Sequence, residues 1–483
     1  MQIVWFRNDL RCRDHAALQS AIAADSTVAV FLWAREQWQN HDVGPARLAF
    51  LRRNLAALAS ELEALNVPFR ILEAQRFSAA PDRLLTLAKQ LKATVVHAVE
   101  EFPLNERRRD SQVARALEAQ GTAFCLHPGG AIRNPGSVTK DDGDPYTVFT
   151  PFKRRWLSGL NDAERRPLKK PRAQEAVDPL PRLSNDVTDS CLDLNSAFDD
   201  VDASLHRSLW PGGESEARRR LDRFTKQRAF AYADARDFAA EPGTSELSPY
   251  LSCGALSGRQ ALAAAISAND GRAANGNPGV DTWISELVWR DFYRHVIVHF
   301  PHVSKRRAFK PATDQVAWRS DQEQLRAWQT GTTGYPMVDA GMRQLNATGW
   351  MHNRLRMICA MFLSKHLLLD WREGERYFMQ QLVDGDFAAN NGGWQWSAST
   401  GTDAQPYFRV FNPTTQAERF DPHGRFILEW IPELAASAQI LTTRKRKAFF
   451  EPWQNPTLSP DYPAPIVEHK AARERAIAAF KAL

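Results

Sequence analysis

The chain has 483 residues, 43% of them hydrophobic, so it is too long for one ordinary core and has enough apolar residues for two. Its net charge of +6 favours an anionic partner such as nucleic acid, with an ordinary, modestly basic enzyme as the alternative. The five cysteines are widely separated and no apolar run has the length of a signal peptide or a membrane span, so we expect a soluble cytoplasmic protein without metal, disulfide framework or membrane segment.

Over residues 1–130, short β-rich runs alternate with longer helical patterns. The β-rich runs are residues 3–6, 28–33, 69–72, 94–99 and 123–127. Between the second and third runs, leucines recur at spacings of three and four, as one helix face requires; they are Leu48, Leu51, Leu55, Leu58, Leu62 and Leu65. This alternation predicts an α/β domain with a doubly wound parallel sheet. No GxGxxG fingerprint follows the first run, so we expect this domain not to hold a dinucleotide.

The pattern changes after residue 160. Residues 161–205 lose periodicity and carry prolines 167, 171, 179 and 181 among charged residues, which is typical of a connector. Helical patterns dominate beyond it. We predict an α/β domain at 1–130, an interdomain linker at 131–205 and an all-α domain at 206–483.

Two segments of the helical part combine charged and aromatic groups. The run TSELS at 244–248 offers hydroxyls and backbone amides at a predicted helix start, where a pyrophosphate could bind; an ordinary helix cap is the alternative. Residues 281–300 have helical periodicity, which places Trp283, Glu286 and Arg290 on one stripe with Trp289 beside it. A surface ion pair over core aromatics is the alternative for that helix.

Residues 370–413 bring three tryptophans together with Asp384, Asp386 and an Asn-Asn-Gly-Gly run. The glycines predict a sharp turn, and indoles beside hydrogen-bonding groups indicate a site and not a core. The carboxylates suit ribose hydroxyls and an adenine amino group, with a solvated turn as the alternative.

Three basic runs are less informative. We expect the arginines at 107–109 and 218–220 to be solvated helix faces, and the run RKRK at 444–447 is undecided.

In order and spacing, these motifs resemble the photolyase and cryptochrome family, from IVWFRNDLR at residue 3 to the end of the chain. The chain is most similar to bacterial class I photolyases that repair cyclobutane pyrimidine dimers. The segment with Tyr232, Arg236 and residues 243–254 matches the family pattern YxxxRDF…GTSxLSPYLxxG. The resemblance implies FAD, reduced in the active state, held by Tyr232, Thr244, Ser245, Glu246, Leu247, Ser248, Trp283, Arg290, Asp384, Gly385, Asp386 and Asn390.

The same resemblance implies an electron path and a lesion site. Trp394, Trp371 and Trp318 match the chain of tryptophans that leads from the flavin to the surface, and Asn390 matches the residue that faces the flavin N5 edge. Glu286 matches a residue that supports the chemistry of the lesion. The implied contacts to UV-damaged DNA or to the lesion are Arg236, Glu286, Trp289, Arg290, Asn353, Arg354, Met357, Trp396, Arg409 and Gln416.

Residues 349–357 discriminate between lesions within the family. Six-four photolyases resemble this segment but carry histidines at the positions of Asn353 and Met357, and His352 is one residue out of register. An amide donates and accepts hydrogen bonds, and a thioether gives a soft apolar contact, which suits a pyrimidine dimer.

Four residues match an antenna site of the folate type. They are His41, Asn105, Glu106 and Lys305. Together they favour 5,10-methenyltetrahydrofolate over a deazaflavin as a second chromophore.

The resemblance implies light-driven repair, in which excited reduced FAD gives an electron to a flipped-out dimer. We expect a monomer that acts on the bacterial nucleoid. A cryptochrome, a blue-light receptor without repair, is the main alternative. Asn353, Met357, Asn390 and the absence of a long C-terminal extension weigh against it. A flavin redox protein or single-strand-binding protein without photochemistry is a third hypothesis.

Overall fold

The computed structural model describes residues 1–177, 191–443 and 446–483. The chain divides into two units. The first comprises Met1–Phe230, Ser245–Pro301 and Val383–Ala388, and the second comprises Ala231–Thr244, His302–Leu382 and Ala389–Leu483. The domain boundaries expected after residues 130 and 205 stay a prediction, and prolines 179 and 181 of the expected linker lie outside the described residues.

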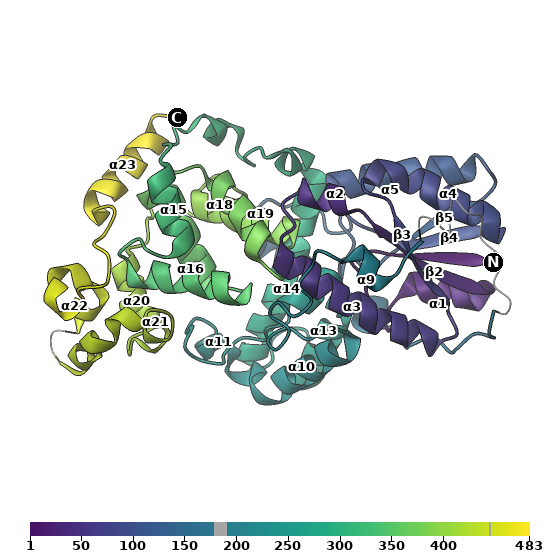
Figure 1. Ribbon diagram of the computed structural model, residues 1–483, viewed down its shortest axis with the longest axis horizontal. Helices are drawn as coiled ribbons and strands as arrows, with labels where there is room; N and C mark the ends of the chain where they lie inside the picture. Colours follow the sequence, from purple (N-terminus) through teal and green to yellow (C-terminus); the bar gives the residue numbers. More distant parts are fainter. Residues whose placement is uncertain (178–190, 444–445) are drawn as a thin grey trace. The chain divides into compact units, whose positions relative to one another are not determined.

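A sheet forms the centre of the first unit (Figure 1). Its strands are β1 (Gln2–Phe6), β2 (Thr27–Trp33), β3 (Phe69–Glu73), β4 (Val95–Val99), β5 (Ala123–His127) and β6 (Cys191–Leu192). The strand order is β5-β4-β1-β2-β3-β6, and β1 to β5 are parallel, so the predicted doubly wound sheet is confirmed. In register, Ile3 lies opposite Val28 of β2 and Val96 of β4. The short antiparallel β6 was not predicted, because its two residues lie in the segment without periodicity.

Helices cover both faces of the sheet, and its central strands β1 and β2 are therefore buried on both sides. In Figure 1, α4 (Ala80–Leu91) and α5 (Leu104–Glu118) lie on one face, and α1 (Ala16–Ala24) and α3 (Pro45–Glu63) on the other. Ile3 and Trp5 join the core on the α4 and α5 side. The predicted leucine face of α3 is confirmed at the buried side chains of Leu48, Leu55, Leu58 and Leu62.

The remaining α-helices of the first unit are α2 (Arg35–Gln39), α6 (Phe149–Ser158), α7 (Asp162–Arg165), α9 (Leu194–Ala197), α10 (Glu214–Gln227), α12 (Ser248–Cys253), α13 (Gly258–Ala268) and α14 (Pro278–His299). The helix predicted over residues 281–300 is α14, which begins three residues earlier. Asn277 caps it by accepting hydrogen bonds from the amides of Gly279 and Val280, and Pro278 occupies the first turn, where no amide donor is needed.

The second unit is helical, as predicted. Its α-helices are α11 (Tyr232–Ala235), α15 (Gln322–Thr330), α16 (Pro336–Thr348), α17 (Asn353–Met361), α18 (Trp371–Gln381), most of α19 (Phe387–Ala398), α20 (Pro413–Phe420), α21 (Arg425–Trp430), α22 (Lys447–Phe450) and α23 (His469–Lys481). A π-helical turn, Phe362–His366, follows α17. Short 3₁₀ helices of the chain are Phe77–Ala79, Ala229–Ala231, Pro301–Lys305, Pro311–Gln315, Pro432–Thr442, Pro452–Gln454 and Pro456–Leu458.

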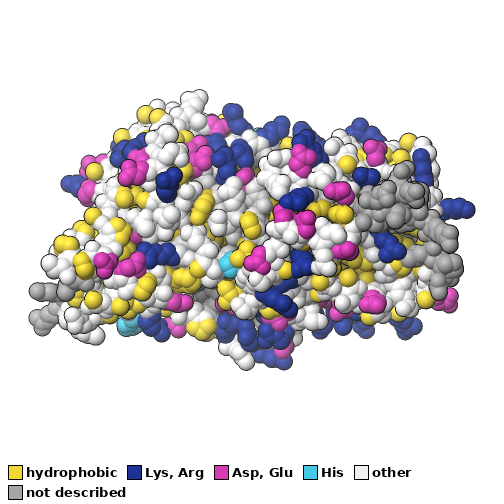
Figure 2. Space-filling view, in the orientation of Figure 1, with side chains coloured by type: hydrophobic (Ala, Val, Ile, Leu, Met, Phe, Trp, Pro, Cys, Tyr) yellow, Lys and Arg dark blue, Asp and Glu magenta, His cyan; other side chains and the backbone are white. Residues whose placement is uncertain are grey.

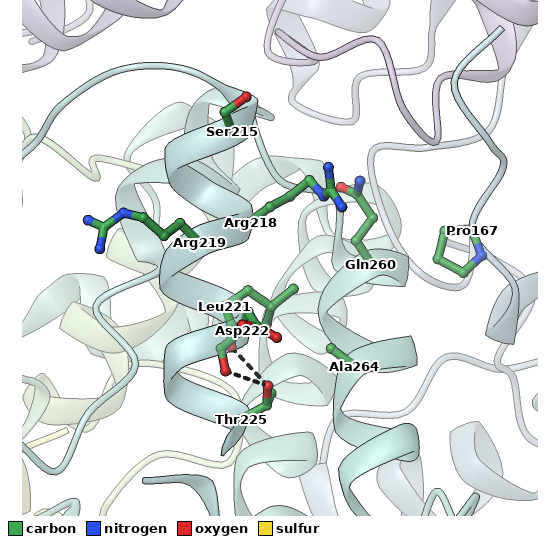
Figure 3. A pocket seen from close by; sticks show the side chains of 9 residues that line it. All are labelled: Pro167, Ser215, Arg218, Arg219, Leu221, Asp222, Thr225, Gln260 and Ala264. Carbon is green, nitrogen blue, oxygen red and sulfur yellow. Dashed lines mark hydrogen bonds between the residues drawn. The ribbon is translucent and has the colours of Figure 1, made fainter. Parts of the chain in front are cut away.

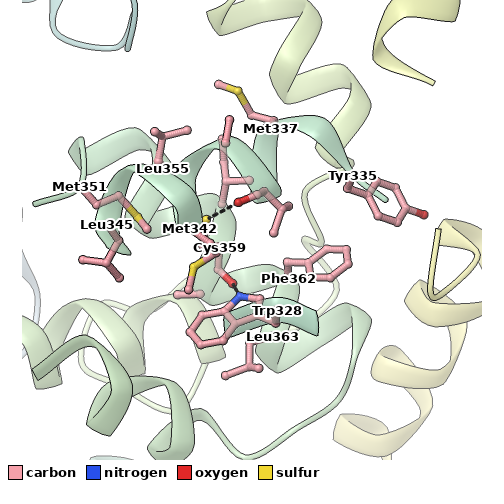
Figure 4. Close-up of a cluster of buried hydrophobic side chains, with 14 of the residues drawn as sticks. Trp328, Tyr335, Met337, Met342, Leu345, Met351, Leu355, Cys359, Phe362 and Leu363 are labelled. Atoms are coloured by element: carbon pink, nitrogen blue, oxygen red, sulfur yellow. Dashed lines mark hydrogen bonds between the residues drawn. The ribbon is translucent and has the colours of Figure 1, made fainter. Parts of the chain in front are cut away.

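Apolar side chains of α15, α16 and α17 form the centre of the second unit (Figure 4). The Trp328 indole is fully buried there, and its Nε1 donates a 3.0 Å hydrogen bond to the Cys359 carbonyl oxygen. A buried indole keeps its polar atom satisfied in this way.

The predicted turn at Asn-Asn-Gly-Gly is wrong, because residues 390–393 lie inside α19. Their amides anchor the helix to α18: Asn390 Nδ2 donates to the Glu375 carbonyl oxygen at 3.0 Å, and Asn391 Nδ2 donates to Glu375 Oε1 at 2.8 Å. Packing of Trp394 in the core adds to these bonds. Tertiary contacts therefore outweigh the low helix propensity of glycine.

Candidate functional site

The stripe predicted on α14 exists in the first unit. Trp283 is buried and its ring lies 4.8 Å from that of Phe224. Arg290 Nη2 donates a 2.7 Å hydrogen bond to the Leu251 carbonyl oxygen, and burial lowers the pKa of Arg290 to about 9. Glu286 is partly buried on the same helix. The helix therefore carries a cation and a carboxylate beside a buried indole.

The segment Asp384–Asp386 is held by two helices of the same unit. Arg294 of α14 pairs with Asp386 at 2.9 Å, and Arg47 of α3 donates to the Gly385 carbonyl oxygen. Arg294 Nη1 is buried and has no hydrogen-bond partner within the described residues. A buried guanidinium donor without an acceptor fits an anionic group such as a pyrophosphate.

The backbone of residues 245–248 has an unusual conformation. Glu246 has a positive φ of 54°, and Leu247 is right-handed with φ −95° and ψ −6°. Such alternation turns successive amides to one side, a geometry that binds anions. The predicted capping by Thr and Ser is wrong, however: α12 begins at Ser248, and its N-cap residue is Leu247, which makes no side-chain cap bond.

Gly254 ends α12 with a φ of +74°. A Cβ at this position would lie 2.1 Å from the carbonyl oxygen of Asn8, in the loop after β1. Only glycine fits both the conformation and the close approach. This contact fixes the end of α12 against the sheet domain.

The loop after β1 is already occupied by a protein group. Glu214, at the start of α10, accepts hydrogen bonds from the amides of Cys12 and Arg13, at 2.9 and 3.2 Å. In dinucleotide-binding folds, amides of this loop hold phosphates. A buried carboxylate takes that place here. The expectation that this domain holds no dinucleotide stays a prediction.

In the second unit, three predicted tryptophans lie in neighbouring elements. Trp371 and Trp394 are buried, and Trp318 is partly buried. Trp318 precedes Arg319, which pairs with Leu369 two residues before Trp371. The ring of Trp394 lies against Gly374, three residues after Trp371. The segments that carry Trp318 and Trp371 are therefore backbone neighbours, and Trp394 packs on the helix that Trp371 begins. An electron path through the three indoles stays a prediction.

The three indoles share a second property. Their Nε1 atoms are buried and have no hydrogen-bond partner within the described residues. An indole that is neither solvated nor bonded sits in a dry, apolar setting. Trp396, two residues after Trp394 on α19, is less buried, as the helical rotation of about 200° predicts.

Two of the residues predicted to contact DNA, Arg236 and Arg354, form a charged cluster with Asp237 in the second unit. Arg354 pairs with Asp237 at 2.8 Å and lies 4.2 Å from the centre of the Phe420 ring. Arg236 Nε is 3.8 Å from the same carboxylate and its guanidinium lies over the Tyr232 ring. Asp237 was missed by the sequence reasoning, although it stands directly after Arg236.

Near this cluster, Asn353 is exposed at the start of α17, and Met357, one turn later, is partly exposed. The preceding His352 is buried and caps the helix, since its Nδ1 accepts from the Arg354 amide. Burial lowers the pKa of His352 to about 4. Asn353 and Met357 therefore face outward, whereas His352 has a structural role.

Three other predicted lesion or DNA residues have distinct surroundings. Trp289 of the first unit stacks on Phe149, with ring centres 3.6 Å apart and planes within 5°. Arg409 is exposed, and Gln416 has a buried Oε1 without a partner within the described residues. Their DNA roles stay predictions.

Three of the four predicted antenna residues lie in the first unit. Asn105 Nδ2 and His41 Nε2 are 2.7 Å apart, within hydrogen-bond distance. Burial, and then the Glu101 carboxylate, raise the pKa of Glu106 to about 7. Lys305 belongs to the second unit, so its relation to these residues stays a prediction.

The arginine runs at 107–109 and 218–220, which we expected to be solvated, each contain one buried arginine. Arg109 pairs with Glu101 at 2.7 Å, and Arg220 pairs with Glu216 at 2.7 Å and donates to the Leu209 carbonyl oxygen. Glu216 stands four residues before Arg220 on α10, whereas Glu101 lies before the start of α5, so helical spacing indicates only the first of these partners. Of the undecided run at 444–447, residues 444 and 445 lie outside the described residues, and Lys447 lies 3.5 Å from Glu451.

The other two arginines of the second run line a shallow pocket of about 550 Å³ between α10 and α13 (Figure 3). It is lined by Pro167, Ser215, Arg218, Arg219, Leu221, Asp222, Thr225, Gln260 and Ala264. Figure 2 shows Lys and Arg side chains gathered over α10. None of the residues predicted to bind a cofactor or DNA lines this pocket.

Comparison with known proteins decides the family. A family model described as DNA photolyase matches residues 2–173, and one described as FAD binding domain of DNA photolyase matches residues 283–482. The chain belongs to the DNA photolyase family. Tyr232 and residues 244–248 lie between the two matched regions.

Similar proteins cover the whole chain. A deoxyribodipyrimidine photo-lyase of Vibrio cholerae is 42% identical, over 100% of this chain and 99% of the relative. A bacterial class III photolyase from Agrobacterium tumefaciens is 33% identical, with a TM-score of 0.85 over 100% of this chain and 97% of that structure. A Synechocystis cryptochrome is 27% identical, with a TM-score of 0.86 over 99% of this chain and 98% of that structure.

Two further findings concern the described part of this family member. None of its described helices is both long and apolar enough to cross a membrane. Within the same residues, His, Cys, Asp and Glu side chains form no group of three or more that could hold a metal ion.

Proposed function

We propose that this photolyase-family protein repairs cyclobutane pyrimidine dimers in DNA under light, with FAD as its cofactor. The observation that carries the activity is the full-length similarity to the Vibrio cholerae protein named deoxyribodipyrimidine photo-lyase. FAD follows from the matched FAD-binding domain. When bound and reduced, FAD supplies the light-driven transfer of one electron to the dimer and its return.

The FAD-holding role is assigned to groups on both units. In the first unit, the proposal rests on the left-handed turn at Glu246, on the segment Asp384–Asp386, on the buried Nη1 donor of Arg294 and on the guanidinium of Arg290. Their charges and amides suit the pyrophosphate and hydroxyl groups of the cofactor. Tyr232, Thr244 and Asn390 of the second unit complete the proposed set, with Ser245, Leu247, Ser248 and Trp283 of the first.

The lesion-binding role is assigned to Asn353, Met357 and the arginines joined by Asp237. An exposed amide can meet a pyrimidine edge, and the thioether beside it can contact an apolar ring. Arg236 and Arg354 are held in fixed directions by one carboxylate, which suits contacts with phosphates on either side of a flipped-out dimer. Glu286, Trp289, Trp396, Arg409 and Gln416 are assigned to the same role.

The electron-supplying role is assigned to Trp318, Trp371 and Trp394. Their order along neighbouring elements supports stepwise transfer from the least buried indole to the most buried ones. A dry setting without an acceptor at Nε1 holds the indole proton in place during such transfer.

The proposed second chromophore is 5,10-methenyltetrahydrofolate. It is supported by the adjacency of His41 and Asn105 and by the partly buried Glu106, which follows Asn105 at the start of α5. We further propose that the protein acts as a monomer in the cytoplasm, on the bacterial nucleoid. Sedimentation of the purified protein at micromolar concentration tests whether it is a monomer.

The second candidate function is a blue-light receptor, because a cryptochrome structure is as similar in fold as a photolyase structure. The decisive experiment is repair of an oligonucleotide with one cyclobutane thymine dimer by purified, reduced protein, in light and in darkness. Repair in light alone is expected. A protein that retains FAD but repairs nothing in light would move the assignment to the receptor.

A further inference from the structure

We propose that Arg47 positions the flavin-binding segment Asp384–Asp386, and that Asn8 and Glu101 link Arg47 to the antenna residues at the start of α5. This inference rests on the proposed binding of FAD and folate. It assigns Arg47, Asn8 and Glu101, to which the motifs gave no role, to the coupling between the parts of the two chromophore sites that lie in the first unit.

The first link joins α3 to the flavin segment. Arg47 lies near the start of α3 and donates through Nη1 to the Gly385 carbonyl oxygen, far away in sequence. A charged donor on a backbone carbonyl gives a strong, directional bond. Arg294 holds the next residue, Asp386, from α14. The short segment is thus fixed by one guanidinium on each flank.

The second link orients Arg47 itself. The other terminal nitrogen, Nη2, donates to Asn8 Oδ1 at 3.3 Å. The amide nitrogen of Asn8 donates in turn to Glu101 Oε1 at 2.7 Å. The Asn8 side chain therefore accepts from Arg47 and donates to Glu101. A single orientation of the Asn8 amide satisfies both bonds.

The third link reaches the antenna residues. The second oxygen of Glu101 accepts a 2.7 Å bond from Arg109, which is buried on α5. Glu106 lies one turn before Arg109 on α5, and the Glu101 carboxylate contributes to its raised pKa. A ligand that orders the start of α5 therefore also orders Glu101.

The physical consequence is mutual stabilisation of the two bound chromophores. A ligand that fixes part of a continuous network lowers the entropy that the second ligand must still remove. The coupling is reciprocal, so bound folate raises the affinity for FAD by the same factor as bound FAD raises the affinity for folate. We expect a factor of about 5, at the lower end of typical couplings.

The first test measures the rate at which FAD leaves the purified holoprotein, followed by the rise in flavin fluorescence. Arg47→Met removes both donors and keeps a similar length, and FAD release is expected to be faster by about tenfold or more. Arg52→Met is the matched control, because Arg52 lies on the same helix and donates to Asn195 instead. Release within twofold of wild type is expected there. Unchanged release from Arg47→Met overturns the positioning role.

A second readout is independent of FAD loading. Amide hydrogen exchange in residues 383–388 is expected to be faster in Arg47→Met than in Arg52→Met, with exchange in the sheet strands unchanged. Equal exchange in the segment contradicts the inference. If Arg47→Met does not fold, Asn8→Ala removes only the bond that orients Arg47, and FAD release about threefold faster than wild type is expected. Release at the wild-type rate overturns the orienting role of Asn8.

The link to the antenna residues is tested by FAD release with and without added 5,10-methenyltetrahydrofolate. Wild type is expected to release FAD about fivefold more slowly with folate, and Asn8→Ala at equal rates in both conditions. A retained folate effect in Asn8→Ala overturns the link. If folate does not bind wild type at all, the antenna proposal fails instead, and Arg47 is judged on release and exchange alone.

Discussion

The ring of Trp394 occupies the space that a side chain at Gly374 would need. A Cβ at Gly374 would lie 2.0 Å from Cη2 of the indole and 2.6 Å from a methyl carbon of Leu363. The glycine thus lets α18, which begins with Trp371, approach α19, which carries Trp394.

Gly374→Ala is therefore expected to destabilise the protein by about 3 kcal/mol, although alanine is the better helix former, because overpacking exceeds the propensity gain. Thermal unfolding by circular dichroism measures this. Gly393→Ala is the control, because no atom lies within 4 Å of a Cβ at that position. Similar unfolding temperatures for both variants would contradict the close packing.

Trp318→Phe is expected to slow photoreduction of oxidised FAD by an order of magnitude or more and to spare repair by chemically reduced protein. The reason is that phenylalanine is much harder to oxidise than tryptophan. The measurement is flavin absorbance under blue light with an external reductant. Trp430→Phe is the control, since Trp430 also has a buried Nε1 without a partner within the described residues. Equal photoreduction in both variants would remove Trp318 from the electron path.

Asn353→Ala is expected to lower light-dependent repair at least tenfold while FAD content stays at the wild-type level. The exposed amide can contact a lesion but makes no part of the core. Repair of a thymine-dimer oligonucleotide and the flavin-to-protein absorbance ratio are measured together. Loss of flavin during purification would show a structural role instead. Asn346→Ala, an exposed residue of α16, is the matched control.

His352→Asn is expected to reduce the loss of stability in acid. Burial lowers the pKa of His352 to about 4, so the folded protein prefers the neutral ring. The stabilisation is complete above the ordinary value of about 6.5 and is lost as pH falls towards 4. Asparagine keeps an N-cap acceptor without titrating. Between pH 7 and 4.5, wild type should lose up to about 3 kcal/mol more than the variant in urea unfolding; parallel pH profiles would contradict this.

Lys365→Met is expected to stabilise the protein at neutral pH. Lys365 is fully buried in the π-helical turn, where burial lowers its pKa to about 7, although its Nζ lies 3.6 Å from the centre of the Phe480 ring. The stability that the neutral amine contributes is present above the ordinary value of about 10.5 and is lost as pH falls to 7. At pH 7.5 the free energy of unfolding of Lys365→Met should exceed that of wild type by about 2 kcal/mol, and by less at pH 10. A lower unfolding temperature at pH 7.5 would show that the cation–π contact prevails.

The elements that follow from residues close in sequence were predictable. The five parallel strands, the leucine face of α3 and the span of α14 depend on local periodicity, which a short window of residues contains. The family resemblance, and with it the set of candidate site residues, also depends on motifs that are contiguous in the chain.

Tertiary structure decided what depends on partners distant in sequence. Glu375 keeps residues 390 and 391 helical, Glu101 buries Arg109 in an ion pair, and Glu214 fills the loop after β1. No periodic pattern shows the path through Arg47 and Asn8, because hydrogen bonds between distant residues leave none. Sequence therefore determined the elements and the family, whereas the setting of each charged side chain required the fold, because burial and pairing are properties of position in space.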